Sequence, residues 1–310
     1  MTLQFDVDKI LLVKLETTYG TDPTPVGGNG FWAKDLKIMP MEGTDIDRGL
    51  DLPYFGSSGT IPVDLHSKIT FDVELAPSGT SGTAPAWGPA LRACGCAETI
   101  VNATSVAYNP ISRGHESATI YVWIDTTLYA ILGARGTAKF DYKSSGVPYI
   151  RFELTGLFTT PTDTARVTPT LSGFQKPLAV SDANTPIFSI GGTDMAMRSC
   201  MLDLGNSVEA RFLVNSEGVL ITDAQATLSA TVEATTMAEF NPYAVAAAQS
   251  DLAISLVHGL GAGNITTLAV PKAQIQRPAG LESAQGVVEW PLSFMPKPTA
   301  GNDQWTLTLT

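Results

Sequence analysis

Residues 135–158, RGTAKFDYKSSGVPYIRFELTGLF, contain the pattern that decides the fold. Apolar side chains occupy every second position on both sides of a turn at residues 144–146: first Ala138, Phe140 and Tyr142, and then Ile150, Phe152 and Leu154. Such alternation around a glycine-containing turn is typical of a β-hairpin with one buried face and one wetter face. We therefore expect a mainly β protein.

The same pattern returns near the end of the chain. Ala273 and Ile275 precede an arm at residues 277–286, and apolar side chains at alternate positions follow it: Val288, Trp290, Leu292 and Phe294. Two hairpins of one design predict two tandem domains, at residues 1–165 and 166–310, which is a duplication rather than a solenoid. The segment 159–170 has two prolines and no long apolar run, so it is the expected boundary. The alternative is one large β domain whose strands all look alike.

Other signals recur in the same order in both halves. The alternation at residues 69–75 corresponds to that at residues 226–232, and the sequence WGP at residues 87–89 corresponds to FNP at residues 240–242. Proline suits the first turn of a helix. Each half is therefore expected to carry one short flanking helix, the first of them within residues 87–99.

Composition and charge limit the function. The chain has 310 residues, a net charge of −11, and three cysteines, an odd number that gives no disulfide framework and fits a reducing cytoplasm. Nucleic acid is gripped through Lys and Arg, so this acidic balance argues against tight DNA binding. No apolar run is long enough for a membrane helix. Asp6, Asp8 and Lys9 interrupt the N-terminal apolar residues, so we expect no secretory signal.

Two polar excursions are candidates for interaction. Residues 42–64 are rich in Gly and Asp and are about twice as long as an ordinary connection. Such a segment indicates a functional loop or an extended arm. Residues 205–219 are the corresponding excursion in the second half and are also expected to be a contact loop.

No pattern of residues indicates catalysis. His66, His115 and His258 lie in no metal-ligand motif, and each is expected at a surface or an edge. Cys94 and Cys96 do not form the CxxC pair of a zinc or redox site. No nucleophile elbow, phosphate-binding loop or paired-carboxylate arrangement is evident. We therefore expect a protein that is not an enzyme and has no cofactor or metal.

Several weak signals together carry a family resemblance. They are the opening KLETTYGTDPTP at residues 14–25, the strand ITFDVEL at residues 69–75, and LRACG at residues 91–95 after an aromatic–Pro turn. In this order, and followed by a hairpin, they resemble the major tail tube proteins of long-tailed non-contractile (siphovirus-type) bacteriophages. The resemblance covers residues 12–158, and extends further only through the expected duplication.

The resemblance implies a fold, an assembly and partners. It implies β-sandwich or split-barrel domains, each with one flanking helix, whose strands join an inner β-barrel in a ring. Two domains per chain imply a homotrimeric, pseudo-hexameric ring, with a hexamer of chains as the alternative. Stacked rings would form a tube in the virion, assembled in the host cytoplasm. DNA would only pass through it, and tape-measure, tail-terminator and distal tail proteins would be partners.

Two sets of residues are candidates for these roles. The candidates for the lumen, which we expect to be acidic so that it repels phosphates, are Asp72, Glu74, Arg151 and Glu153. The candidates for contacts between rings are Asp45, Asp47, Arg48, Asp51, Tyr54 and Phe55. The alternative functions are another ring-forming virion protein, for tail completion or capsid decoration, and a carbohydrate-binding β-sandwich.

Overall fold

The structure is a computed structural model that describes residues 7–310, so Asp6 of the N-terminal segment lies outside the described residues. The first half contains the 3-10 helix η1 (Gly27–Asn29), α1 (Gly88–Ala93) and strands β1 (Lys9–Leu15), β2 (Gly30–Phe31), β3 (Lys34–Asp47), β4 (Thr60–Glu74), β5 (Cys96–Val101), β6 (Ser105–Pro110), β7 (Ala118–Ile124), β8 (Thr127–Lys143), β9 (Tyr149–Leu157) and β10 (Thr162–Asp163).

The second half contains α2 (Pro242–Ala248) and the remaining strands: β11 (Ile187–Ile190), β12 (Thr193–Asp194), β13 (Met197–Asp203), β14 (Asn206–Leu213), β15 (Ser216–Ala224), β16 (Thr227–Glu233), β17 (Asp251–His258), β18 (Thr266–Ile275), β19 (Glu282–Ala284), β20 (Val287–Pro296) and β21 (Thr306–Leu309). The protein is thus mainly β, as predicted. Neither helix of the described chain is long and apolar enough to cross a membrane.

Strands of the two halves pair in the same order. In the first half the antiparallel neighbours run β1–β7–β8–β9–β4–β3. In the second half they run β11–β17–β18–β20–β16–β13. Each order places the hairpin predicted from the sequence, β8–β9 or β18–β20, in the middle of its series. The predicted β8–β9 hairpin is confirmed, with Phe140 opposite Ile150 and Ala138 opposite Phe152.

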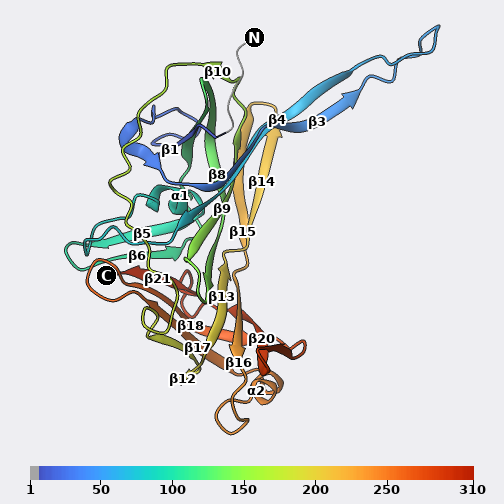
Figure 1. The fold of residues 1–310 in the computed structure, drawn as a ribbon. Helices are drawn as coiled ribbons and strands as arrows, with labels where there is room; N and C mark the ends of the chain where they lie inside the picture. The colour runs from blue at the N-terminus through green and yellow to red at the C-terminus, as the bar shows by residue number, and fades with distance from the viewer. Residues whose placement is uncertain (1–6) are drawn as a thin grey trace.

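Two junctions join the halves (Figure 1). The end of β8 pairs with β13, from Lys139 opposite Asp203 to Lys143 opposite Ser199. The C-terminal strand β21 pairs with β6 of the first half. Because β8 also pairs with β9, the strands β3–β4–β9–β8–β13–β16–β20 form one continuous curved layer, which we call the wall.

Glycines let β8 belong to two ladders. Its N-terminal part pairs with β7 and its C-terminal part with β9, and the register to β9 shifts between Leu132 and Arg135. Gly133 has φ +60°, a left-handed conformation that glycine adopts without penalty. At Gly136 a Cβ atom would lie 2.1 Å from the carbonyl oxygen of Glu153, so a side chain cannot be accommodated there.

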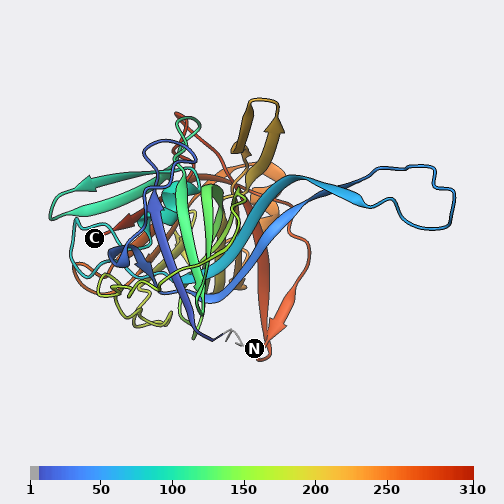
Figure 2. The same cartoon turned by 90° about the horizontal axis from the view of Figure 1, so that it is seen from above.

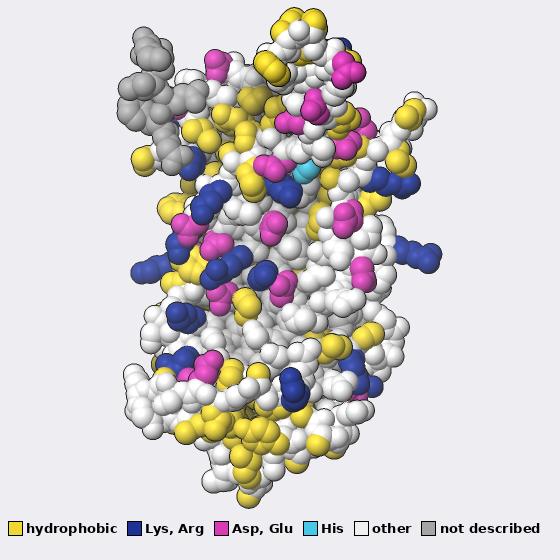
Figure 3. Space-filling model, turned by 90° about the vertical axis from the view of Figure 1, so that its right-hand side faces the viewer, with side chains coloured by type: hydrophobic (Ala, Val, Ile, Leu, Met, Phe, Trp, Pro, Cys, Tyr) yellow, Lys and Arg dark blue, Asp and Glu magenta, His cyan; other side chains and the backbone are white. Residues whose placement is uncertain are grey.

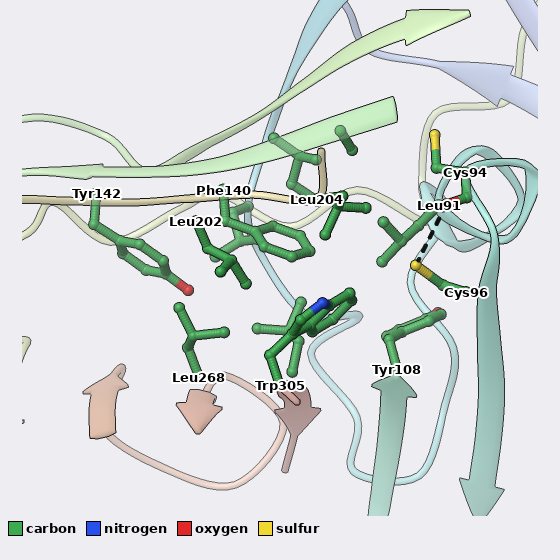
Figure 4. Packing of buried hydrophobic residues seen from close by; sticks show 14 of the residues in the cluster. Leu91, Cys94, Cys96, Tyr108, Phe140, Tyr142, Leu202, Leu204, Leu268 and Trp305 are labelled. Carbon is green, nitrogen blue, oxygen red and sulfur yellow. Dashed lines mark hydrogen bonds between the residues drawn. The ribbon is translucent and has the colours of Figure 1, made fainter. Parts of the chain in front are cut away.

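One hydrophobic core lies behind the wall and spans both halves (Figure 4). Phe140 of β8 packs edge-on against Trp305, just before β21, with ring centroids 5.7 Å apart. Figure 4 places Leu202 of β13 and Leu268 of β18 beside these rings. Burial of this apolar surface from both halves holds β13 and β21 against the first half, in addition to the backbone hydrogen bonds.

Both expected short helices are present, and the first occupies only part of residues 87–99. α1 ends at Ala93, whereas we expected helix within residues 87–99, because Gly95 takes φ +74° and Thr99–Val101 are β-branched residues that extend β5. Cys94 and Cys96 are both buried on the two sides of this turn. The short helix expected in the second half is confirmed as α2, in which the Asn241 side chain accepts a hydrogen bond from the Ala244 N–H at 3.0 Å.

His258 is buried on a strand that is paired on both sides, whereas we expected it at a surface or an edge. Its side chain is 3% exposed at the end of β17. The Thr185 hydroxyl lies 2.9 Å from Nδ1, and the Leu178 carbonyl oxygen lies 3.2 Å from Nε2. Burial lowers the pKa of His258 below the ordinary value of 6.5, and the Leu178 carbonyl opposes this shift. The neutral ring therefore joins the segment before β11, at Leu178 and Thr185, to the end of β17.

This burial predicts a pH dependence of stability. The pKa of His258 is lower in the folded than in the unfolded state, so the unfolded state binds more protons below about pH 6.5. The free energy of unfolding should fall as pH drops through 6.5 and level off below the folded-state pKa. His258→Gln should flatten this part of the profile in urea titrations of the unassembled chain. The same change at the half-exposed His66 is the control, and an unchanged profile for His258→Gln would contradict the assignment.

Candidate assembly surfaces

Residues 42–64 form an extended arm, the second of the two structures expected for them. β3 and β4 continue beyond the wall as a two-stranded ribbon that ends in a loop at residues 48–59. In two perpendicular views this β3–β4 arm projects away from the rest of the chain (Figures 1 and 2). An isolated two-stranded ribbon is at best marginally stable in water. The arm is therefore a candidate for contact with another surface.

All six candidates for contacts between rings lie at the far end of the arm. Asp45 and Asp47 are on β3, and Arg48, Asp51, Tyr54 and Phe55 are in the loop. Each is exposed, and the side chains of Tyr54 and Phe55 are 69% and 109% exposed. Adjacent aromatic side chains in water indicate a contact site, because exposed apolar groups otherwise favour aggregation.

Residues 205–219, expected to be a loop, instead belong to the β14–β15 hairpin. This hairpin occupies the place between β13 and β16 that the arm occupies between β3 and β4. It docks on the first half of its own chain. The Val219 N–H donates to the Tyr19 hydroxyl at 2.6 Å, and Arg135 donates to the Val219 carbonyl at 2.8 Å. Sequence reasoning missed these anchors, although a lone arginine within the apolar β8 pattern was a signal.

Asn206 fixes the root of the hairpin. Its side-chain amide donates to the Cys94 carbonyl at 2.7 Å and to the Gly136 carbonyl at 2.9 Å. Beside it, the Ile221 side chain lies 3.3 Å from where a Cβ of Gly95 would be. The C-terminal end of α1 in the first half is thus covered by the root of a hairpin from the second half.

Removing this amide should loosen the junction. Asn206→Ala leaves two carbonyl groups without their donor, which should lower the free energy of unfolding by about 1–3 kcal/mol. Ser207→Ala, at the next and exposed position, is the matched control and should change it by less than about 0.5 kcal/mol. Equal urea midpoints for the two variants would show that the hairpin is not anchored by Asn206.

The candidates for the lumen share the face of the wall opposite the core. Asp72 lies opposite Arg151, Glu153 lies opposite Thr70, and Glu74 lies opposite Tyr149. The face is of mixed sign, not acidic as expected, because cations from neighbouring positions accompany the carboxylates. Arg151 pairs with Asp141, and the Lys139 ammonium lies 2.8 Å from the Asp203 carboxylate.

Cross-strand pairing accounts for this mixture. Partial burial raises the pKa of Asp72 above its ordinary value, and the nearby Arg151 opposes this rise.

In the second half the same face carries mainly hydroxyl groups, from Ser199, Thr227, Ser229, Thr231 and Ser293. Figure 3 shows charges of both signs across the middle of the molecule and a hydrophobic cluster near its lower end.

The wall has an open edge at each end, one along β3 and the other along β18 and β19, which pair with the outer side of β20. Within residues 7–310, β3 pairs only with β4, so its other edge faces solvent. At the other end, the Gln276 N–H still donates to the Ser293 carbonyl at 2.8 Å, but residues 277–281 leave the ladder before β19 rejoins it. Open edges expose unpaired backbone groups and readily accept another strand.

The edge of β3 borders a hollow, whereas the corresponding place beside β13 is occupied by another part of the chain. The hollow is lined by residues from β1, β2 and β3, including Lys9, Phe31 and Lys37. At the corresponding edge of β13, the turn between β8 and β9 is in place. The Ser144 N–H donates to the Arg198 carbonyl and the Ser145 N–H to the Val180 carbonyl, both at 2.8 Å.

The described chain shows no grouping that suggests metal chemistry. Among residues 7–310 no three His, Cys, Asp or Glu side chains gather at one point. The cysteines are buried, and burial raises the pKa of the Cys200 thiol to about 12. A thiol with this pKa is a poor nucleophile at neutral pH. The surfaces that stand out are therefore the arm, the wall face and the two open edges.

Comparison with known proteins agrees with these features. No curated protein matches the chain. The model of one family, described as phage tail tube protein, matches residues 7–296, which is nearly the whole chain and includes both halves, the arm and the wall. A protein of this family is a structural component of the phage virion. The chain belongs to the phage tail tube protein family.

Proposed function

We propose that three copies of this chain close a ring and that stacked rings form the tail tube through which DNA is ejected. Each chain would supply two tube domains, at residues 1–165 and 166–310. The observation that carries the proposal is the repeated strand order, β1–β7–β8–β9–β4–β3 and β11–β17–β18–β20–β16–β13, with an internal junction between its units. β8 and β13 pair within a chain, and in this proposal the two open edges pair in the same way between neighbouring chains.

The correspondence gives a register for the junction between chains. We align Trp290 of β20 with Ile150 of β9. Val232, opposite Trp290, then corresponds to Val73, opposite Ile150, which shifts the correspondence expected from the sequence by two residues. In this alignment Glu282, opposite Glu289, corresponds to Asp141, opposite Tyr149.

The other strand of the junction is placed in the same way. Met201 lies opposite Ser229 on β16, and Lys37 lies opposite Thr70 on β4, so Lys37 corresponds to Met201. Asp141 faces Met201 across the internal junction. In the ring, Glu282 of one chain then faces Lys37 of the next, which is a favourable cross-strand pair.

A charge exchange tests this register. Lys37→Glu and Glu282→Lys each place like charges opposite one another, at a cost of up to about 1 kcal/mol per junction. Each single variant should raise the concentration needed for tubes, by up to about fivefold, and the double variant should restore it. The exposed Lys176→Glu in the linker is the control. If the double variant is no better than the worse single variant, the register is wrong.

The ring itself is tested by negative-stain electron microscopy of the purified protein, with averaged end views classified for symmetry. Hollow tubes with threefold rings are the expected result. Sixfold rings of whole chains would keep the tube but contradict the trimer. Closed rings that never stack would favour another ring-forming virion protein, and monomers at every concentration would overturn the proposal.

The arm is assigned to contacts between rings through its exposed tip. Tyr54→Ser with Phe55→Ser removes two apolar anchors that touch little within the chain, so the free energy of unfolding should change by less than about 0.5 kcal/mol. Rings should still form, whereas long tubes should not. Val101→Ser, at a similarly exposed apolar position on β5, is the control. Tubes of normal length from the arm-tip variant would refute this role.

The wall face is assigned to the lumen. Asp72, Glu74, Arg151 and Glu153 would line it together with the hydroxyl groups of the second half. Paired charges offer few free cations to phosphates, so DNA would slide past without counterion-release binding. In this role the tube is assembled in the bacterial cytoplasm, and its lumen and ends meet tape-measure, tail-terminator and distal tail proteins.

A further inference from the structure

The two helices occupy corresponding places but differ in burial. Each follows a wall strand, β4 or β16, and precedes β7 or β17. In α1 the residues Gly88, Ala90, Leu91 and Ala93 are buried, whereas in α2 only Pro242 is buried. Tyr243 is 42% exposed, and Ala244, Ala247 and Ala248 face solvent. A short apolar helix left in water lacks the packing from which protein helices gain most of their stability.

The end of α1 owes part of its cover to the junction between halves. Asn206 and Ile221, at the root of the β14–β15 hairpin, lie against Cys94 and Gly95. The second half has no hairpin like β5–β6 between its helix and its next strand, because β17 begins three residues after α2 ends. Ala247 to Ser250, at the end of α2, are accordingly exposed.

The root of the β3–β4 arm corresponds to the root of the β14–β15 hairpin. Glu42 on β3 pairs with His66 on β4, and Asn206 on β14 pairs with Ala224 on β15. Glu42 lies as far along the chain from Lys37 as Asn206 lies from Met201, which corresponds to Lys37. Met39 and Met41 at this root are 40% and 52% exposed. The exposed parts of these methionine side chains and the exposed alanine residues of α2 are both apolar.

We infer that the root of the arm of one chain covers the C-terminal end of α2 in the neighbouring chain of the same ring. This inference rests on the proposed ring. The occupant is a second copy, since the equivalent contact already exists inside each chain. Gln249 follows α2 at the position of Cys94 after α1, and its amide can donate to the carboxylate of Glu42, which stands in place of Asn206.

The assignment divides the arm into two functional parts. Its root, around residues 39–44, makes a lateral contact within the ring, and its tip, at residues 48–59, remains free to reach another ring. At the root, β4 also pairs with β9, from His66 opposite Leu157, and the His66 ring lies 6.1 Å from that of Phe212 on β14. Among the described residues β3 pairs only with β4, so a ring contact at the root would support β3.

Hydrogen exchange of the wild-type protein is the first test. In free chains the amides of residues 245–249 should exchange quickly, because the helix is short and exposed. In purified tubes their exchange should slow at least tenfold, while α1 should be protected in both states. Unchanged exchange of α2 in tubes confirmed by microscopy would overturn the inference and leave the tube function standing. A failure to form tubes at all would instead count against the proposed function and, with it, the inference.

Cross-linking tests which chains meet. Met41→Cys and Ala248→Cys in one chain, treated with a short bis-maleimide in assembled tubes, should give covalent oligomers that end at the trimer. Each single variant should give at most dimers, and the three native cysteines are buried. Thr44→Cys with Ala247→Cys is the second pair if the first prevents assembly. Ladders beyond the trimer would show contact between rings, and monomers alone from both pairs would exclude the contact.

Discussion

Backbone hydrogen bonding between β8 and β13 is the interaction on which the rest of the structure depends. It joins two ladders of the same order into one wall, and it sets the β14–β15 hairpin against the first half. An open strand edge exposes unpaired backbone N–H and C=O groups, which readily form hydrogen bonds with the edge of another strand. Within residues 7–310, β8 and β13 join one such pair of edges, whereas the edges at β3 and at residues 276–284 stay unpaired.

Much of the fold follows from period-two patterning. Ile150, Phe152 and Leu154 had to share a face, and the structure buries all three. The helix expected within residues 87–99 ends at Ala93, because Gly95 takes a left-handed conformation and the β-branched residues Thr99–Val101 continue as a strand. The hairpin at residues 206–224 was missed, although Val208, Ala210 and Phe212 alternate with polar residues on β14. Its docking on Tyr19 and Arg135 of the first half has no local signal in the hairpin sequence.

The assembly surfaces were harder to predict than the strands. The aromatic tip of the arm is visible in the sequence, since Tyr54 and Phe55 interrupt a polar segment. An open edge is a property of the backbone and has no residue signature. The mixed charge of the wall face was also hidden, because Asp72 meets Arg151 only through the register of β4 and β9. The net charge of −11 for the whole chain does not predict the balance of charges on this one face.

The proposed duplication would explain why corresponding surfaces differ. In a ring of identical single domains every junction forms between molecules, and each association carries a translational and rotational cost. In the proposed trimer half of the six junctions form during folding, so that cost arises at three. The internal junction can then be fixed by Asn206 and β21, while the external one stays open until chains meet. That difference accounts for a buried α1 beside an exposed α2, and for a docked hairpin beside a free arm.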